Sequence, residues 1–123
     1  MSSPQAKERT RVAVVHDNLE FLVRTVSALR ADGHDTAAFS DTMSALNALA
    51  AALPCKVLIT RVHFPPGQPH GMSLALMVRN SRPDIKILFA EEEETQIYTE
   101  GLGEFLPTPV AADQIVVTVG RML

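Results

Sequence analysis

Short apolar runs alternate with stretches of helical spacing along this chain, and this alternation restricts the fold more than any single motif does. Between the runs, apolar residues recur three or four positions apart, which places them on one face of a helix. Repeated strand–helix pairs of this kind favour a parallel sheet that is covered by helices on both faces. The five predicted strands span residues 11–15, 35–39, 57–60, 85–90 and 104–106.

We therefore expect an α/β three-layer sandwich of the flavodoxin-like (βα)5 type, with a parallel five-stranded sheet in the order 2-1-3-4-5. Residues 1–9 are polar and aperiodic, so we expect a flexible N-terminal tail and one domain over 10–123. In open sheets of this type, ligands bind beyond the carboxyl ends of the strands, where the strand order reverses. That crevice would be lined by His16, Asp17, Arg61 and the residue that follows the fourth strand.

The ends of the predicted helices are marked by polar residues. Asp17 or Asn18 is expected to cap the first helix, and Ser40 the second. The acidic run Glu91–Glu94 is expected to begin a fourth helix that reaches Glu100, because negative charge complements the amino end of a helix. The expected apolar face of the first helix consists of Leu19, Leu22, Val23, Val26 and Leu29.

Net charge, the lengths of the apolar runs and the cysteine count each limit what this chain can do. A net charge of −3 argues against nucleic-acid binding through phosphate contacts. No apolar run reaches the roughly 18 residues that a membrane helix needs, so no membrane association is expected. The single cysteine, Cys55, forms no internal disulfide. A reducing, cytoplasmic setting is the simplest interpretation.

Five segments of the chain, in this order, resemble the receiver domain of two-component response regulators. The resemblance covers residues 10–123 and implies a CheY-like fold of bacterial signal transduction. The segments are RVAVVHDN at 11–18, LRADGH at 29–34, VHFPP at 62–66 with Gly71, RPDIKILFA at 82–90 and GLGEFLPTP at 101–109.

The functional positions that the resemblance implies are mostly altered. Such receivers hold Mg²⁺ with an acidic pair after the first strand, where this chain has His16 and Asp17. Their phosphoacceptor aspartate corresponds to Arg61, their hydroxyl residue after the fourth strand to Glu91, and their lysine after the fifth strand to Thr108. The chain therefore resembles a degenerate member, a pseudo-receiver with a degenerate phosphorylation site. The family's cis peptide is expected at Thr108–Pro109.

An arginine in the acceptor position removes the chemistry of aspartyl phosphorylation. A guanidinium has no carboxylate oxygen to attack phosphorus and no lone pair for a metal. We expect no catalytic residue, no metal and no cofactor, and hence no enzyme. Instead, Arg61 is expected to bridge Asp17 and Glu91 through its planar fork.

The leading functional hypothesis is a signalling module that acts by phosphorylation-independent protein–protein interaction. Its partner would be another signalling protein: a kinase, a regulator or an effector. The interaction face, and a face for homodimerisation, would combine the fourth helix, the fifth strand and the last helix. Its expected residues are Phe105, which matches the family's aromatic switch, and Tyr98, Val116 and Val117.

Two alternatives remain open from the sequence. The first is an active phosphorelay regulator with a displaced acceptor, either His16 or another acid. The second is a variant that binds a small ligand or a metal at the strand switch point. His16, His63 and His70 flank that rim and suggest zinc or nickel, but they lack close ligand spacing. Residues 91–104 hold six acids and no basic residue, which favours a docking patch for a basic partner.

Overall fold

A computed structural model describes residues 11–51 and 53–123. Its five strands form one parallel sheet in the order β2-β1-β3-β4-β5, which confirms the predicted topology. The tail expected at residues 1–9 lies outside the described residues. The strands are β1 (Arg11–Val15), β2 (Asp35–Phe39), β3 (Val57–Thr60), β4 (Lys86–Glu91) and β5 (Glu104–Pro107).

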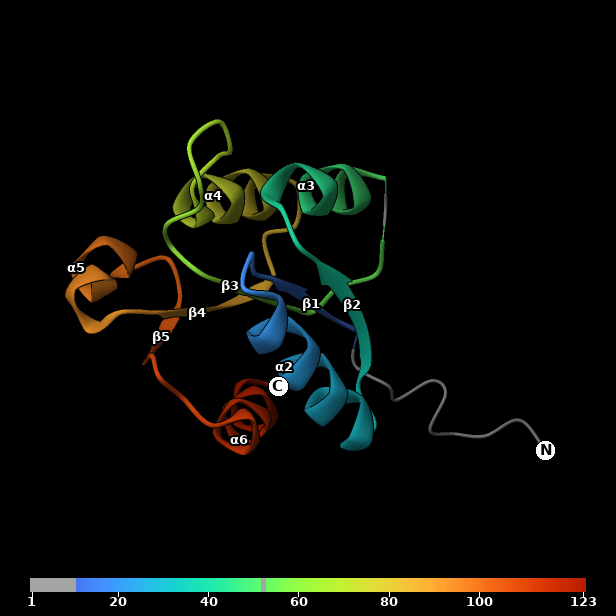
Figure 1. The fold of residues 1–123 in the computed structure, drawn as a ribbon. Coiled ribbons are helices and arrows are strands. Elements are labelled where there is room, and N and C mark those ends of the chain that lie inside the picture. Colours follow the sequence, from blue (N-terminus) through green and yellow to red (C-terminus); the bar gives the residue numbers. More distant parts are fainter. Residues whose placement is uncertain (1–10, 52) are drawn as a thin grey trace.

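The helices form two layers, one on each face of the sheet. Helices α3 and α4 cover one face, α2 and α6 cover the other, and α5 lies at the β5 edge (Figure 1). None of the helices in the described part of the chain is both long and apolar enough to cross a membrane. The helices are α2 (Leu19–Ala31), α3 (Thr42–Ala50), α4 (Gly71–Ser81), the 3₁₀ helix η1 (Glu93–Thr95), α5 (Gln96–Thr99) and α6 (Ala112–Met122).

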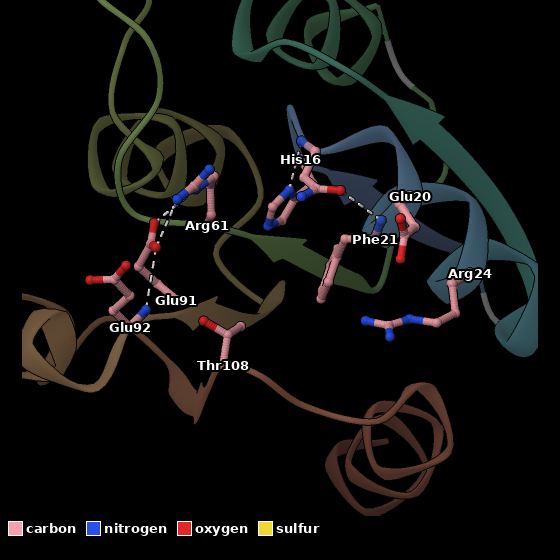
Figure 2. A pocket seen from close by; sticks show the side chains of 9 residues that line it. His16, Glu20, Phe21, Arg24, Arg61, Glu91, Glu92 and Thr108 are labelled. Carbon is pink, nitrogen blue, oxygen red and sulfur yellow. Dashed lines mark hydrogen bonds and ion pairs between the residues drawn. The ribbon is translucent and has the colours of Figure 1, made fainter.

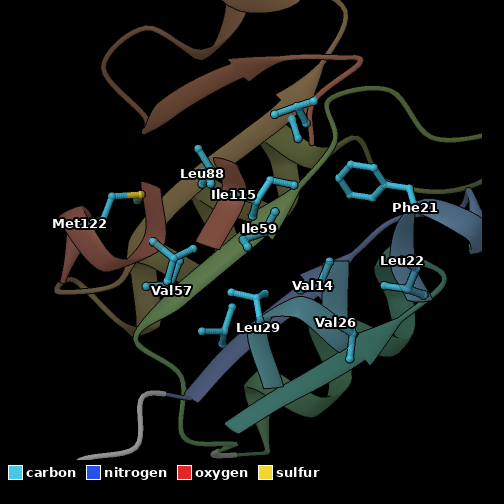
Figure 3. Packing of buried hydrophobic residues seen from close by; sticks show 14 residues of the cluster. Val14, Phe21, Leu22, Val26, Leu29, Val57, Ile59, Leu88, Ile115 and Met122 are labelled. Atoms are coloured by element: carbon cyan, nitrogen blue, oxygen red, sulfur yellow. The ribbon is translucent and has the colours of Figure 1, made fainter. Parts of the chain in front are cut away.

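The strands separate two apolar clusters because successive side chains point to opposite faces. Val12 and Val14 of β1 pack in the cluster under α2 and α6 (Figure 3). Ala13 and Val15 pack in the cluster under α3 and α4. Since both faces are covered, the central strands are continuously apolar, which is why their bounds could be predicted to within one residue.

The predicted face of α2 was partly wrong. Leu19 and Val23 are 63% and 64% exposed, whereas Phe21 and Thr25 are buried together with Leu22, Val26 and Leu29. Leu19 and Val23 lie on one side of the apolar face of α2, and the residues on the other side of that face pack against the sheet. The spacing of apolar residues predicted the helix correctly, but it did not predict which of those residues pack against the sheet.

Of the two predicted helix caps, the one at α2 is confirmed as one of its two candidates, and the one at α3 is wrong by one residue. Asn18, not Asp17, caps α2, and its Oδ1 accepts the Phe21 N–H at 3.0 Å. Asp41, not Ser40, caps α3, and its Oδ1 accepts the Ser44 N–H at 2.7 Å. Because Asn18 caps α2, the Asp17 carboxylate has no capping role.

The segment after β4 forms less helix than predicted. Glu91 is the last residue of β4 rather than the first of a helix, and only η1 and the four-residue α5 follow. Thr95 and Thr99 are the buried side chains of these two elements. So little buried apolar surface gives a longer helix few tertiary contacts to stabilise it.

Candidate functional site

The sheet register brings the candidate residues to one edge. Val15 pairs with Thr60, and Thr60 pairs with Phe89, so the three central strands end almost level. Arg61 follows β3 directly, while Glu91 ends β4 two residues beyond the pairing with Thr60. This is the strand switch point at which the sequence predicted a crevice.

Arg61 bridges both acids, as predicted. Its Nε and Nη2 donate to Glu91 Oε1 and Oε2, each at 2.8 Å, which forms a bidentate pair. Its Nη1 donates to Asp17 Oδ1, also at 2.8 Å. Figure 2 shows the guanidinium and the Glu91 carboxylate pointing toward each other. Hydrogen bonding to Glu91 is the main reason that the pKa of Arg61 is raised, so the guanidinium stays charged.

Glu91 is the most enclosed acid of the site, with 4% of its surface exposed. Besides Arg61, it accepts the N–H groups of Val62 at 3.3 Å, His63 at 3.1 Å and Glu92 at 3.3 Å. Burial alone would raise the pKa of Glu91, but the Arg61 and backbone hydrogen bonds outweigh it and lower that pKa from 4.5 to about 2. The carboxylate is therefore ionised at neutral pH.

His16 is a buried neutral imidazole. Its Nδ1 accepts the Asn18 N–H at 3.0 Å, and its ring stacks on Phe21 with centroids 4.2 Å apart. Burial, and then the charge of Arg61, lowers the pKa of His16 to about 4. Nδ1 therefore carries no proton at neutral pH, and its 4.0 Å separation from Asp17 Oδ1 is not an ion pair there.

A polar pocket of about 230 Å³ opens beside this cluster. Thr108 lies on its rim, and the Thr108 N–H donates to the Glu91 carbonyl at 2.8 Å. The Thr108–Pro109 peptide is cis, as predicted. The pocket is lined by His16, Asn18, Glu20, Phe21, Arg24, Arg61, Glu91, Glu92 and Thr108 (Figure 2).

These residues do not fit a Mg²⁺ ion. Mg²⁺ demands several oxygen ligands in near-octahedral geometry. Here one oxygen of Asp17 and both oxygens of Glu91 are hydrogen-bonded to a permanent cation. The His63 and His70 rings meet edge to face at 5.7 Å, but His16 does not join them. Among the described residues, no group of three or more His, Cys, Asp or Glu side chains is arranged to hold a metal.

The four residues expected on an interaction face are divided between surface and interior. Tyr98 on α5 and Val117 on α6 are 58% and 70% exposed. Phe105 and Val116 are half-buried, and each packs against a different core cluster. Exposed apolar area on α5 also includes Ile97, 68% exposed, which the prediction omitted.

Sequence reasoning missed four contributors to the site. The Val62 and His63 backbone N–H groups donate to Glu91, and no residue type signals a backbone donor. The Phe21 ring stacks on the His16 ring. The Arg24 guanidinium lies over the Phe21 ring, 5.7 Å from the centroid of that ring. The position of Phe21, one turn after the cap, could have indicated that it lies near the site. Phe21 was not among the residues of the predicted apolar face of that helix.

Several solved structures that resemble this chain are response regulator receivers. The response regulator receiver protein from Sinorhizobium medicae WSM419 matches with a TM-score of 0.84 and 19% identity, over 94% of this chain and 95% of that chain. Chemotaxis response regulator CheY4 of Vibrio cholerae matches with a TM-score of 0.81 and 22% identity, over 94% and 99%. The receiver domain of NtrX from Brucella abortus matches with a TM-score of 0.78 and 19% identity, over 89% of this chain and 95% of that chain.

At these identities the likeness establishes the fold, which is that of a receiver domain. No protein-family model matches the sequence. No curated protein matches it either.

Proposed function

We propose that this chain is a receiver-like signal transduction module that binds other proteins without being phosphorylated. One observation carries the proposal. At the carboxyl end of β3, where the resemblance places an acceptor aspartate, the Arg61 guanidinium is bound by Glu91 and Asp17 at 2.8 Å. This pseudo-receiver would act in the cytoplasm, without a cofactor and without catalysis.

The chemistry of the site supports the absence of phosphorylation. An acyl phosphate forms only where a carboxylate oxygen attacks phosphorus and a cation neutralises the transferred oxygens. The two carboxylates nearest Arg61 already accept its N–H groups, and Glu91 is also enclosed by backbone donors. Both oxygens of Glu91 are therefore occupied, and one oxygen of Asp17 is held by the Arg61 guanidinium. His16 is buried, and its Nδ1 accepts a backbone N–H.

The surface of α5 supports binding to a protein partner. Ile97 and Tyr98 are exposed large apolar residues on a helix of four residues. Exposed acids surround them in sequence at Glu93, Glu94 and Glu100. This composition favours a signalling partner, whether kinase, regulator or effector, whose surface is basic and partly apolar. A homodimer through α5, β5 and α6 is the other occupant that we propose for this face.

Intact-mass analysis tests the absence of phosphorylation. The chain is incubated with acetyl phosphate, with Mg²⁺ and with EDTA, and a phosphorylatable receiver domain serves as the positive control. We expect no gain in mass under either condition. A stoichiometric gain of one phosphoryl group that requires Mg²⁺ would show that an active phosphorelay function is retained.

Affinity capture from the native cell tests the interaction face. Ile97→Ser removes exposed apolar area from α5, and Val23→Ser removes a similar area, 64% exposed, from α2. We expect Ile97→Ser to lose partners that the wild type and Val23→Ser retain. Equal capture by all three proteins would contradict the assignment of this face. Sedimentation of the same variants distinguishes a homodimer from a foreign partner.

A further inference from the structure

The Glu91 carboxylate accepts more hydrogen bonds than a simple ion pair requires. The Arg61 fork supplies two of them, each at 2.8 Å. The consecutive backbone N–H groups of Val62 and His63 supply two more, at 3.3 and 3.1 Å, to Oε1. Three adjacent residues of the loop after β3 therefore converge on one carboxylate that arrives from a different strand.

This donor set has the composition of an oxyanion receptor. A guanidinium fork binds carboxylates and phosphates through two parallel N–H bonds. Successive backbone N–H groups in a loop form a concave anion site. The receptor is contributed by residues 61–63, while the oxyanion that fills it belongs to Glu91, thirty positions away in the chain.

An external anion could reach the receptor if the carboxylate were absent. Both Arg61 and Glu91 line the pocket of about 230 Å³, and that pocket opens to solvent. Removing the carboxylate would leave the fork and two N–H groups directed at a vacated, enclosed position. The empty receptor would then bind a small oxyanion.

We propose that Glu91 is a built-in ligand, whose carboxylate fills an oxyanion receptor formed by Arg61, Val62 and His63 and thereby fixes the connection between β4 and α5. The wild-type chain would consequently take up no free oxyanion at this site. The chain would hold the connection between β4 and α5 permanently in the conformation that binding of an external anion would otherwise have to induce.

The geometry links the receptor to the surface of α5. The next residue, Glu92, donates its N–H to the Glu91 carboxylate. The Glu92 carbonyl then accepts both the N–H and the hydroxyl of Thr95, at 3.0 and 2.7 Å. Tyr98 follows three residues later. That fixing α5 matters for partner binding rests on the proposed function, whereas the receptor itself does not.

The composition of the chain supplies a reporter for this region. Tyr98 is the only tyrosine, and the chain has no tryptophan. Intrinsic fluorescence therefore reports the surroundings of α5 without any labelling.

The test is rescue of Glu91→Ala by acetate. The variant is compared with wild type, with Glu91→Gln, whose amide still fills the site, and with Arg61→Met/Glu91→Ala, which lacks the fork. Sodium chloride at equal ionic strength and neutral acetamide are the control solutes. We expect about 100 mM acetate to raise the melting temperature of Glu91→Ala by about 4 °C or more and to restore its Tyr98 emission. The other three proteins should show no acetate-specific shift.

Each remaining outcome decides the proposal. If Glu91→Ala is unfolded in chloride, the folded fraction is titrated with acetate instead, and recovery of structure supports the receptor. Failure of acetate to stabilise or refold Glu91→Ala beyond chloride would overturn it, as would an equal effect on the double variant. A rise in melting temperature without any change in Tyr98 emission would overturn the link to α5. Because no partner protein is involved, failure here is distinguishable from failure of the proposed function.

Discussion

Two arginine–glutamate ion pairs in this protein differ in how much of each side chain is exposed to water. The Arg61–Glu91 pair is mostly enclosed, with side-chain exposures of 25% and 5%. The Arg121–Glu104 pair joins α6 to β5 at the surface, with exposures of 64% and 43%. Water screens the second pair but has little access to the first, so similar distances imply different energies.

We expect Arg61→Ala to lower the free energy of unfolding by about 2–3 kcal/mol, because it leaves the buried Glu91 carboxylate without its charged partner. The pKa of Glu91 should also rise, since burial raises it and Arg61 lowers it. Urea denaturation at neutral pH measures the first effect, and carboxyl NMR titration the second. Arg121→Ala is the matched control and should leave stability unchanged within error. Equal losses for both variants would contradict this interpretation.

His16 makes stability depend on pH in a defined window. Its pKa is about 4 in the folded chain and 6.5 as an ordinary histidine. The unfolded chain therefore binds a proton first as pH falls below 6.5, and folding is weakened by up to about 1.4 kcal/mol per pH unit until pH approaches 4. Glu91 acts in a lower window, because its stabilisation is lost only between pH 4.5 and about 2.

The expected result is that His16→Asn flattens the stability profile between pH 6.5 and 4. Urea unfolding across this range measures the slope. His70→Asn, at an exposed position, is the control and should retain the wild-type slope. The assignment to His16 fails if the two variants have the same profile.

Among the helices, α2 shows how one element separates buried from exposed leucines. Leu22 is 6% exposed and packs in the cluster under α2 and α6, whereas Leu19 is 63% exposed. Only one flank of the apolar arc meets the sheet, so identical side chains three positions apart contribute differently.

Leu22→Ala should destabilise the protein by about 2–5 kcal/mol, because it opens a cavity in the core. Leu19→Ala should change the free energy of unfolding by no more than about 0.5 kcal/mol. Denaturant unfolding of both variants measures the difference. Comparable losses would mean that Leu19 is covered in solution, for example by a second copy of the chain.

Across the whole molecule, close backbone approach fixes how α4 meets β3. A Cβ built on Gly71, the first residue of α4, would lie only 1.7 Å from the Arg61 carbonyl oxygen. The Gly71 N–H also donates to the Val62 carbonyl at 2.8 Å. The loop that carries the oxyanion receptor is thus held at a distance that only glycine permits.

We expect Gly71→Ala to destabilise the chain by about 1–3 kcal/mol or more, because the backbone must shift to admit the methyl group. Gly120→Ala in α6 meets nothing within 4 Å and should stabilise it by about 0.5–1 kcal/mol through helix propensity. Melting temperatures of the two variants should move in opposite directions. A neutral Gly71→Ala variant would show that the approach of α4 to β3 is looser than described.

Three features could be predicted from the chain alone: the fold class, the strand order and the presence of Arg61 at the end of β3. The fold class depends on local periodicity and on short apolar runs, which each segment carries independently of its neighbours. The strand order was predicted from the arrangement that is usual for sheets of this class. The convergence of Arg61, Asp17 and Glu91 was also predictable, because carboxyl ends of parallel strands meet at one edge.

The tertiary structure alone decided that Glu91 ends β4 and accepts backbone N–H groups from the loop after β3. It also decided that Asn18 caps α2 and that Leu19 faces outward. The physical reason is the same in each case. Backbone donors have no sequence signature, and the choice between neighbouring candidate residues depends on how segments far apart in the chain pack together.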